Sequence, residues 1–253
     1  DIIIVDCGIQ FPTEEMPGID FLIPDFTYLL ENKDRVKGMI VTHGHEDHIG
    51  AIPYLLKNVN VPIYATKLTI GLIKSRLEEK SSVKNHTFIE VFPRDVVHIG
   101  EFLIEFIKVN HSIIGGVGLA IQTKIGTIIH TGDFKIDFSP IDNMVLDITQ
   151  FAHYGEKGVL LLMSDSTNSE SIGYTKSESI LSEKLTKLFS HSKGRIIVAT
   201  FASNIHRIQQ VLNTATRYNR KVVISGLSMQ KNIEIAKRLG FLSFKEDLIV
   251  DID

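Results

Sequence analysis

Residues 38–50 read GMIVTHGHEDHIG and contain His43, His45, Asp47 and His48. The apolar start of this stretch predicts a buried strand, and the histidines follow it directly in a loop that leads into a helix. A solvated histidine-rich turn is the alternative interpretation, and the zinc-protease pattern HExxH does not occur. However, imidazole and carboxylate groups suit zinc, and these four exceed what one tetrahedral site with a bound water requires. The stretch therefore predicts a site for two metal ions.

Three further polar residues follow apolar runs that predict strands: Asp6, His111 and Asp133. A carboxylate at a strand end can bridge two cations, or it can accept the second N–H of a ligating imidazole and so fix its tautomer. Each residue also has a simpler interpretation when it is taken alone. His111 is then a surface histidine, Asp133 a turn residue and Asp6 an Asx turn.

Hydrophobic periodicity changes along the chain. The polar, turn-rich segment 164–171 precedes a boundary that we place near residue 172. Beyond it, helices and strands alternate, which implies a parallel sheet with crossover helices. The first part is predicted to contain strands 38–42, 62–64, 87–91, 101–109, 117–123, 126–130 and 158–163 and helices 48–57, 66–79 and 142–154; the second contains helices 176–190, 204–217 and 228–239 and strands 195–200, 221–225 and 247–250.

The composition, with 43% hydrophobic and 23% charged residues in 253, is that of a soluble globular protein. No apolar run approaches the roughly 20 residues that span a bilayer, and we expect no contact with a membrane. The single cysteine, Cys7, fits a reducing cytoplasm. The net charge of −3 is unusual for a nucleic-acid enzyme, but a metal site supplies positive charge of its own.

Longer stretches resemble a known family. VDCGIQFPTEEMPGIDFLIPDFTYL (5–29), VKGMIVTHGHEDHIGAIPYLL (36–56), HTGDFKID (130–137), LLMSDSTNSE (161–170) and RIIVATFASNIHRIQQV (195–211) are similar to the bacterial ribonuclease J family, in the β-CASP branch of the metallo-β-lactamase superfamily. The resemblance runs over nearly the whole chain. It implies an α/β protein with an incomplete metallo-β-lactamase αββα sandwich over 1–172 and part of a β-CASP parallel α/β domain over 173–253.

The resemblance also implies the roles of single residues. Two Zn²⁺ ions are the implied cofactors, with Mn²⁺ as the alternative. Asp6 is implied to orient a ligating histidine. The implied ligands are His43, His45 and His111 for one ion and Asp47 and His48 for the other, with Asp133 between the two, and the implied catalytic carboxylates are Asp47, Asp133 and Asp165.

The turn formed by Phe201, Ala202, Ser203 and Asn204 joins a predicted strand to a predicted helix. Backbone N–H groups at the start of a helix can bind an anion without any net positive charge. The resemblance implies that this turn contacts an RNA phosphate. The alternative is that Ser203 or Asn204 only caps the helix.

The implied function is a zinc-dependent ribonuclease that hydrolyses RNA phosphodiester bonds, as a 5′-to-3′ exonuclease, an endonuclease or both, in RNA maturation and decay. The expected partner is RNA with a 5′ monophosphate, and we expect a homo-oligomer for the full-length protein and a cytoplasmic location. The family places one more metal-binding histidine and part of its phosphate pocket further downstream. We therefore expect the isolated chain to bind the second metal weakly and to have little nuclease activity.

Two other functions compete with this one. A hydrolase of thioesters or lactams from the same superfamily would need the motifs before residue 165 but has no reason to carry 175–253. A binding or scaffold protein with a decayed site is the second alternative. Every ligand that the family pattern expects within this chain is present, which argues against decay.

Overall fold

The computed structural model describes residues 1–80 and 85–251, which form two compact units. Both units are built from segments that are far apart in the sequence. Among the residues described, each helix is too short or too polar to span a bilayer. Unit 1 consists of Asp1–Val109, Gly115–Phe134 and Asp147–Ser166, and unit 2 consists of Asn110–Ile114, Lys135–Leu146 and Thr167–Asp253.

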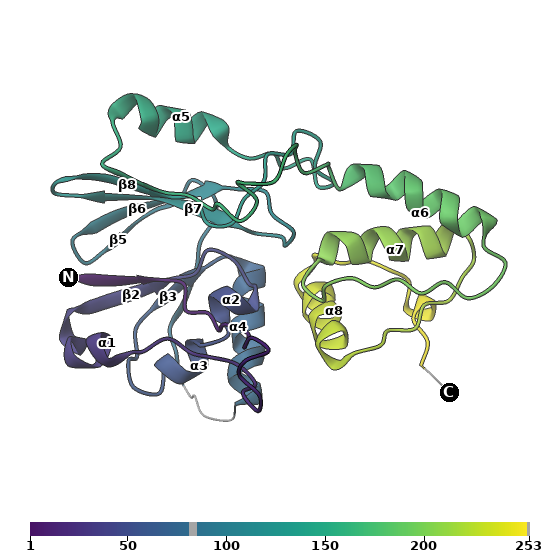
Figure 1. Cartoon of the computed structure of the whole chain (residues 1–253), viewed down its shortest axis with the longest axis horizontal. Coiled ribbons are helices and arrows are strands. Elements are labelled where there is room, and N and C mark those ends of the chain that lie inside the picture. Colours follow the sequence, from purple (N-terminus) through teal and green to yellow (C-terminus); the bar gives the residue numbers. More distant parts are fainter. Residues whose placement is uncertain (81–84, 252–253) are drawn as a thin grey trace. The chain divides into compact units, whose positions relative to one another are not determined.

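The first sheet of unit 1 is parallel, with its strands in the order β1-β2-β3-β4. Most residues of β2 and β3 are buried, which is typical of parallel strands that are covered on both faces. Figure 1 shows α1 to α4 on one side of this sheet and a second sheet on the other. The elements are β1 (Ile2–Val5), α1 (Thr27–Glu31), η1 (Lys33–Arg35), β2 (Val36–Ile40), α2 (Glu46–Ile49), α3 (Ile52–Leu55), β3 (Ile63–Ala65), α4 (Lys67–Glu79) and β4 (Phe88–Glu90).

The second sheet has the order β5-β6-β7-β8-β9, and its last pair, β8 and β9, is parallel while the others are antiparallel. Alternate residues of β6 are buried on opposite faces: Ile104 and Phe106 join the core between the sheets, and Ile107 packs towards α5. Unit 1 is thus an αββα sandwich, as expected. The elements are β5 (Val96–Ile99), β6 (Phe102–Lys108), β7 (Val117–Thr123), β8 (Gly126–His130), α5 (Ile148–Lys157) and β9 (Leu161–Met163).

A buried polar network fastens α5 to this sheet. Glu105 of β6 accepts hydrogen bonds from Tyr154 Oη, at 2.6 Å, and from Gln150 Nε2, at 2.7 Å. Burial, together with the neighbouring carboxylate of Glu105, raises the pKa of Tyr154 to about 12. Gln150 and Tyr154 of α5 therefore form hydrogen bonds with the sheet and not with solvent.

The predicted helix 48–57 is wrong as one continuous element, because the structure divides it into α2 and α3. Gly50 ends the first turn, and a Cβ at this position would lie 2.6 Å from the Glu46 carbonyl oxygen. Pro53 then stands in the first turn of α3, where its missing N–H has no partner to lose. The predicted helix 142–154 is also shifted, since α5 begins at Ile148 and ends at Lys157.

Unit 2 contains the three predicted helices, α6 (Ser179–His191), α7 (Ile205–Arg217) and α8 (Leu227–Leu239), and a short 3₁₀ turn, η2 (Glu246–Leu248). The predicted strands 195–200, 221–225 and 247–250 are wrong as regular strands. Within the described part of unit 2, Val222 and Ile249 form a single parallel bridge. A strand is stable only beside a paired neighbour, and Ile197, for example, remains 89% exposed.

Candidate metal centre

The loop after β2 places its polar side chains at the C-terminal edge of the parallel sheet. Thr42 and His43 are buried within this loop. His43, His48 and Asp133 each offer one ligand atom, and these atoms lie within 4.8 Å of one another. The cluster therefore joins the loop after β2, the helix α2 and the loop after β8 at one point of unit 1.

The distances within the cluster suit a zinc ion. Asp133 Oδ2 lies 3.6 Å from His48 Nε2 and 3.9 Å from His43 Nε2, and His48 Nε2 lies 3.7 Å from Asp47 Oδ2. Two atoms that bind one zinc ion at about 2.0–2.1 Å in a tetrahedron lie about 3.4 Å apart. The side chains are thus spaced so that small movements allow neighbouring atoms to share a cation.

Asp6 orients His48. Its Oδ2 lies 2.8 Å from His48 Nδ1, and because a carboxylate only accepts, the ring must donate its Nδ1–H. Nε2 then faces Asp133 and Asp47. This is the geometry that the orienting role predicted for Asp6 requires.

Thr42 has the corresponding effect on His43, and sequence reasoning did not single it out. Thr42 donates from its backbone N and its Oγ1 to the two oxygens of Asp6, at 2.7 and 2.8 Å. The hydroxyl hydrogen is then committed to Asp6, so Oγ1 accepts from His43 Nδ1, which lies 3.1 Å away. His43 Nε2 is then unprotonated, so it can bind a metal ion or accept a hydrogen bond from His45 Nδ1, which lies 3.0 Å away. The only signal in the sequence was a Thr between the strand and the first His.

The backbone around Asp6 explains the sequence Asp-Cys-Gly. Asp6 has a φ of 61°, in the left-handed region that Asp tolerates better than most residues. A Cβ on Gly8 would lie 1.6 Å from the carbonyl oxygen of Asp47, so only glycine allows this approach to α2. Cys7 N donates to His48 O at 2.8 Å. The segment therefore fixes both a side chain and the backbone of the predicted site.

The cluster attracts positive charge. Burial disfavours the charged form of His48, but hydrogen bonds and charges of Asp133 and Asp6 outweigh it and raise the pKa of His48 to about 10. Since a metal ion must displace this proton, the same carboxylates that stabilise the imidazolium favour a cation in its place.

Asp165 lies beside the loop that carries Asp133. The parallel strands β8 and β9 pair His130 with Met163, so the residues that follow them leave the sheet at the same edge. Asp165 Oδ2 accepts from Phe134 N at 3.3 Å, and Asp165 N donates to Thr131 Oγ1 at 3.0 Å. Asp165 is thus held beside the loop that carries Asp133, and its catalytic role remains a prediction.

The other predicted residues belong to unit 2. His111 lies in the segment Asn110–Ile114, so its role as a ligand remains a prediction. In the turn 201–204, Asn204 caps α7, because its Oδ1 accepts from Arg207 N at 3.1 Å. Phe201 is 79% exposed. The capping interpretation of Asn204 is therefore confirmed, and the phosphate contact, which is compatible with it, is still a prediction.

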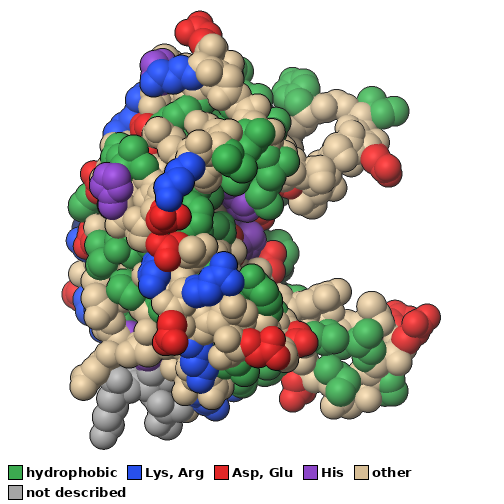
Figure 2. All heavy atoms as spheres, turned by 90° about the vertical axis from the view of Figure 1, so that its left-hand side faces the viewer, with side chains coloured by type: hydrophobic (Ala, Val, Ile, Leu, Met, Phe, Trp, Pro, Cys, Tyr) green, Lys and Arg blue, Asp and Glu red, His purple; other side chains and the backbone are tan. Residues whose placement is uncertain are grey.

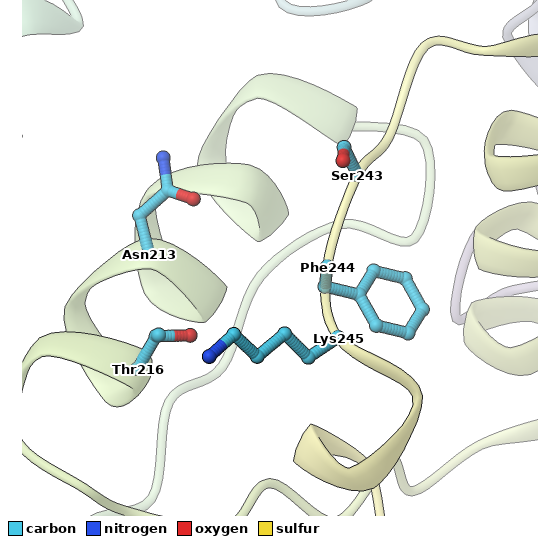
Figure 3. A pocket seen from close by; sticks show the side chains of 5 residues that line it. All are labelled: Asn213, Thr216, Ser243, Phe244 and Lys245. Atoms are coloured by element: carbon cyan, nitrogen blue, oxygen red, sulfur yellow. The ribbon is translucent and has the colours of Figure 1, made fainter.

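Two surface features do not mark the site. Figure 2 shows Lys and Arg mixed with Asp and Glu over the face in view, with no continuous basic patch among the described residues there. Unit 2 contains a cavity of about 370 Å³, and Figure 3 shows the side chains that line it. None of the predicted site residues lines this cavity, so we do not assign the chemistry to it. Its lining residues are Asn213, Thr216, Ser243, Phe244 and Lys245.

Comparison with known families agrees with this geometry. Residues 1–166 match the model of the metallo-beta-lactamase superfamily. The chain belongs to this superfamily. Residues 193–253 match the model of the beta-CASP domain of ribonuclease J. Both parts of the resemblance found in the motifs are thus confirmed, and the loop 42–48 lies within the part that defines the superfamily.

Three curated relatives of this chain are named as ribonucleases of the J type. The chain is 51% identical to "Ribonuclease J" of Helicobacter pylori over 95% of its length, 44% to "Ribonuclease J" of Synechocystis and 40% to "Ribonuclease J2" of Bacillus subtilis, the last two over its whole length. It spans 35%, 40% and 45% of these proteins. A crystal structure of a protein of unknown function from Enterococcus faecalis has the same fold, with a TM-score of 0.65 at 18% identity over 99% of this chain and 68% of that one.

Proposed function

We propose that this chain carries the metal centre of a ribonuclease of the ribonuclease J type. The observation that supports this most directly is the cluster of His43, His48 and Asp133, in a chain that is 40–51% identical to proteins of that name. The match of residues 193–253 to a beta-CASP domain argues against a hydrolase of thioesters or lactams.

The proposed centre holds two Zn²⁺ ions, or two Mn²⁺ ions. His43, His45 and His111 would hold the first ion, Asp47 and His48 would hold the second, and Asp133 would contribute to both. When bound, the metals supply positive charge beside the scissile phosphate and lower the pKa of the attacking water.

The protein contributes orientation and proton transfer. Asp6 and Thr42 hold His48 and His43 in the tautomers that point Nε2 at the centre. Asp47 is the exposed carboxylate of the group, with 62% of its side chain accessible, so it can orient water or accept its proton in addition to binding metal. Asp165 is the third proposed catalytic carboxylate, after Asp47 and Asp133.

The proposed substrate is RNA with a 5′ monophosphate. Phe201, Ala202, Ser203 and Asn204 contact a phosphate in this proposal, because they precede the N-terminus of the thirteen-residue helix α7. The full-length protein acts in the cytoplasm as a homo-oligomer, by exonucleolytic cleavage, endonucleolytic cleavage or both, in RNA maturation and decay.

The test uses the full-length protein and RNAs that differ only in a 5′ monophosphate, 5′ triphosphate or 5′ hydroxyl. Cleavage by the wild type is compared with that by the double variant His45→Ala, Asp47→Ala. The matched control is His98→Ala, which changes an exposed histidine of β5. We expect the double variant to lose cleavage by about 100-fold or more, because the metals provide the main electrostatic stabilisation, and the control to keep it. Equal cleavage by the double variant would remove the metal centre from the proposal.

A further inference from the structure

Helix α2 carries two predicted ligands but is too short to be stable without contacts to other elements. It consists of Glu46–Ile49, a single turn in which only Ile49 is buried. The first turn of a helix is costly to form, and a helix this short has no stability of its own in water. The positions of Asp47 and His48 must therefore be set by contacts that α2 makes with the rest of unit 1.

One set of contacts holds the backbone of α2. Cys7 N donates to His48 O at 2.8 Å, and Ile9 N donates to Glu46 O at 3.1 Å. These bonds tie two carbonyl groups of α2 to the segment after β1. Neither bond involves the Glu46 side chain, which contacts another element.

That element is α4. Arg76 Nε donates to Glu46 Oε2 at 3.1 Å, and Arg76 Nη2 lies 2.5 Å from Glu46 Oε1. Such a two-point contact between a guanidinium and a carboxylate fixes orientation as well as distance. Helix α4 has thirteen residues and a well-buried face, so it is a firm support. Figure 1 shows α4 beside α2 on the same side of the parallel sheet.

The sequence around Glu46 fits this arrangement. Glu46 stands between His45 and Asp47, and both of its oxygens are engaged by Arg76, so it is not offered to a metal. A Cβ on Gly50 would lie 3.0 Å from Glu46 Oε2, so glycine leaves the room that this side-chain position needs. Arg76 also donates to Glu79 on its own helix, at 2.9 Å.

We propose that Glu46 and Arg76 are positioning residues, which hold α2 so that Asp47 and His48 can bind the second metal ion. The inference rests on the two-metal centre of the proposed function. Both side chains are about one-third exposed, and ion pairs of this exposure contribute little to the free energy of unfolding. The effect of the pair is therefore expected in metal affinity more than in stability.

The test measures Zn²⁺ binding to the full-length protein by competition with a chromophoric chelator, and Co²⁺ binding by its visible absorption. Glu46→Gln is compared with Glu79→Gln, which removes the charge of the other carboxylate that Arg76 contacts, on its own helix α4. We expect Glu46→Gln to lower the affinity for one of the two ions by about 10-fold or more. This is the loss typical when a group that supports metal ligands is removed. Glu79→Gln should bind both ions like the wild type, and both variants should keep the wild-type melting temperature.

Arg76→Lys and a double variant make the test independent of Glu46→Gln alone. Lysine keeps the charge but not the two-point contact, so the loss of affinity should persist. Glu46→Gln combined with Arg76→Met should bind no more weakly than Arg76→Met alone, because the two residues act as one unit. If Glu46→Gln does not fold, the metal affinity of Arg76→Lys alone tests the positioning role.

The outcomes separate this inference from the function on which it rests. Wild-type affinity for both ions in Glu46→Gln and Arg76→Lys overturns the positioning role, and so does an equal loss at both ions together with a lower melting temperature. A wild-type protein that binds fewer than two ions overturns the two-metal centre itself, whatever the variants do.

Discussion

At the scale of single residues, Asp6 connects the most groups of the centre. Its carboxylate accepts from Thr42 and from His48, so one side chain fixes the ligating nitrogen of His48 directly and that of His43 through Thr42. Asparagine tolerates the φ of 61° at this position, but its NH₂ group cannot accept. We therefore expect Asp6→Asn to fold normally and to bind Zn²⁺ about 10- to 100-fold more weakly.

Equilibrium competition for Zn²⁺ checks this prediction, with circular dichroism as the control for folding. An unchanged affinity in Asp6→Asn would show that the tautomers of the histidines are set by other groups.

Gly8 is the second residue on which the centre depends. A Cβ here meets the Asp47 carbonyl oxygen at 1.6 Å, so Gly8→Ala must push the backbone away from α2. We expect a loss of about 1–3 kcal/mol in the free energy of unfolding, as overpacking typically causes. Gly155→Ala is the control, because its Cβ meets no other atom within 4 Å and alanine favours the helix α5 by about 1 kcal/mol. Urea denaturation of both variants measures the difference, and a Gly8→Ala protein as stable as the wild type contradicts the close contact.

The residue types of the site differ in how well the sequence predicts them. His43, His45, Asp47 and His48 lie within one short loop, so their spacing alone predicts a metal site. Asp6 and Asp133 reach the same point only through the strand order of the two sheets, which local spacing does not contain, and they were assigned through the family resemblance. Thr42 was missed because a threonine beside a histidine carries no distinct signal.

At the scale of elements, the buried contact between α5 and β6 predicts a dependence on pH. Tyr154 is 4% exposed and donates to Glu105, and its pKa is raised to about 12. The folded state therefore keeps this proton where the unfolded chain, with a pKa of about 10, loses it. The stability that Tyr154 contributes is present below about pH 10 and is lost as the pH rises towards 12.

Tyr154→Phe tests this contact. We expect the variant to be less stable by about 1.5–3 kcal/mol at pH 7, the range for a hydrogen bond to a charged group. The difference from the wild type should shrink as the pH rises from 10 to 12. Denaturation curves at several pH values measure it, and a difference that stays constant over this interval contradicts the assignment.

Element prediction succeeded for α4 and for strands that have a paired neighbour in a sheet. The predicted helix 66–79 corresponds to α4, and strands 117–123 and 126–130 correspond to β7 and β8. Apolar runs such as 195–200 were overpredicted, because apolar and β-branched residues favour a strand but do not determine whether a neighbouring strand is present to pair with it. The prediction of helix 48–57 failed at Gly50, where a Cβ would lie 2.9 Å from Ile9 Cγ1, because the local pattern does not contain this tertiary contact.

At the scale of the whole molecule, the superfamily fold brings distant segments of unit 1 to one edge. The loops after β1, β2 and β8 supply Asp6, the histidine-rich loop and Asp133, and none of these segments alone could bind two metals. The second part of the chain matches a beta-CASP domain, which links this centre to RNA in the proposed function.

Removal and return of the metal tests the central claim most directly. The full-length protein is freed of metal by chelation, assayed on 5′-monophosphorylated RNA, and assayed again after Zn²⁺ or Mn²⁺ is added, beside the double variant His45→Ala, Asp47→Ala. We predict that the wild type loses cleavage, regains it with metal and binds two ions, and that the variant never regains it. Cleavage that continues without metal, or that returns equally in the variant, would contradict the assignment of the 43–48 loop as the metal centre of a ribonuclease.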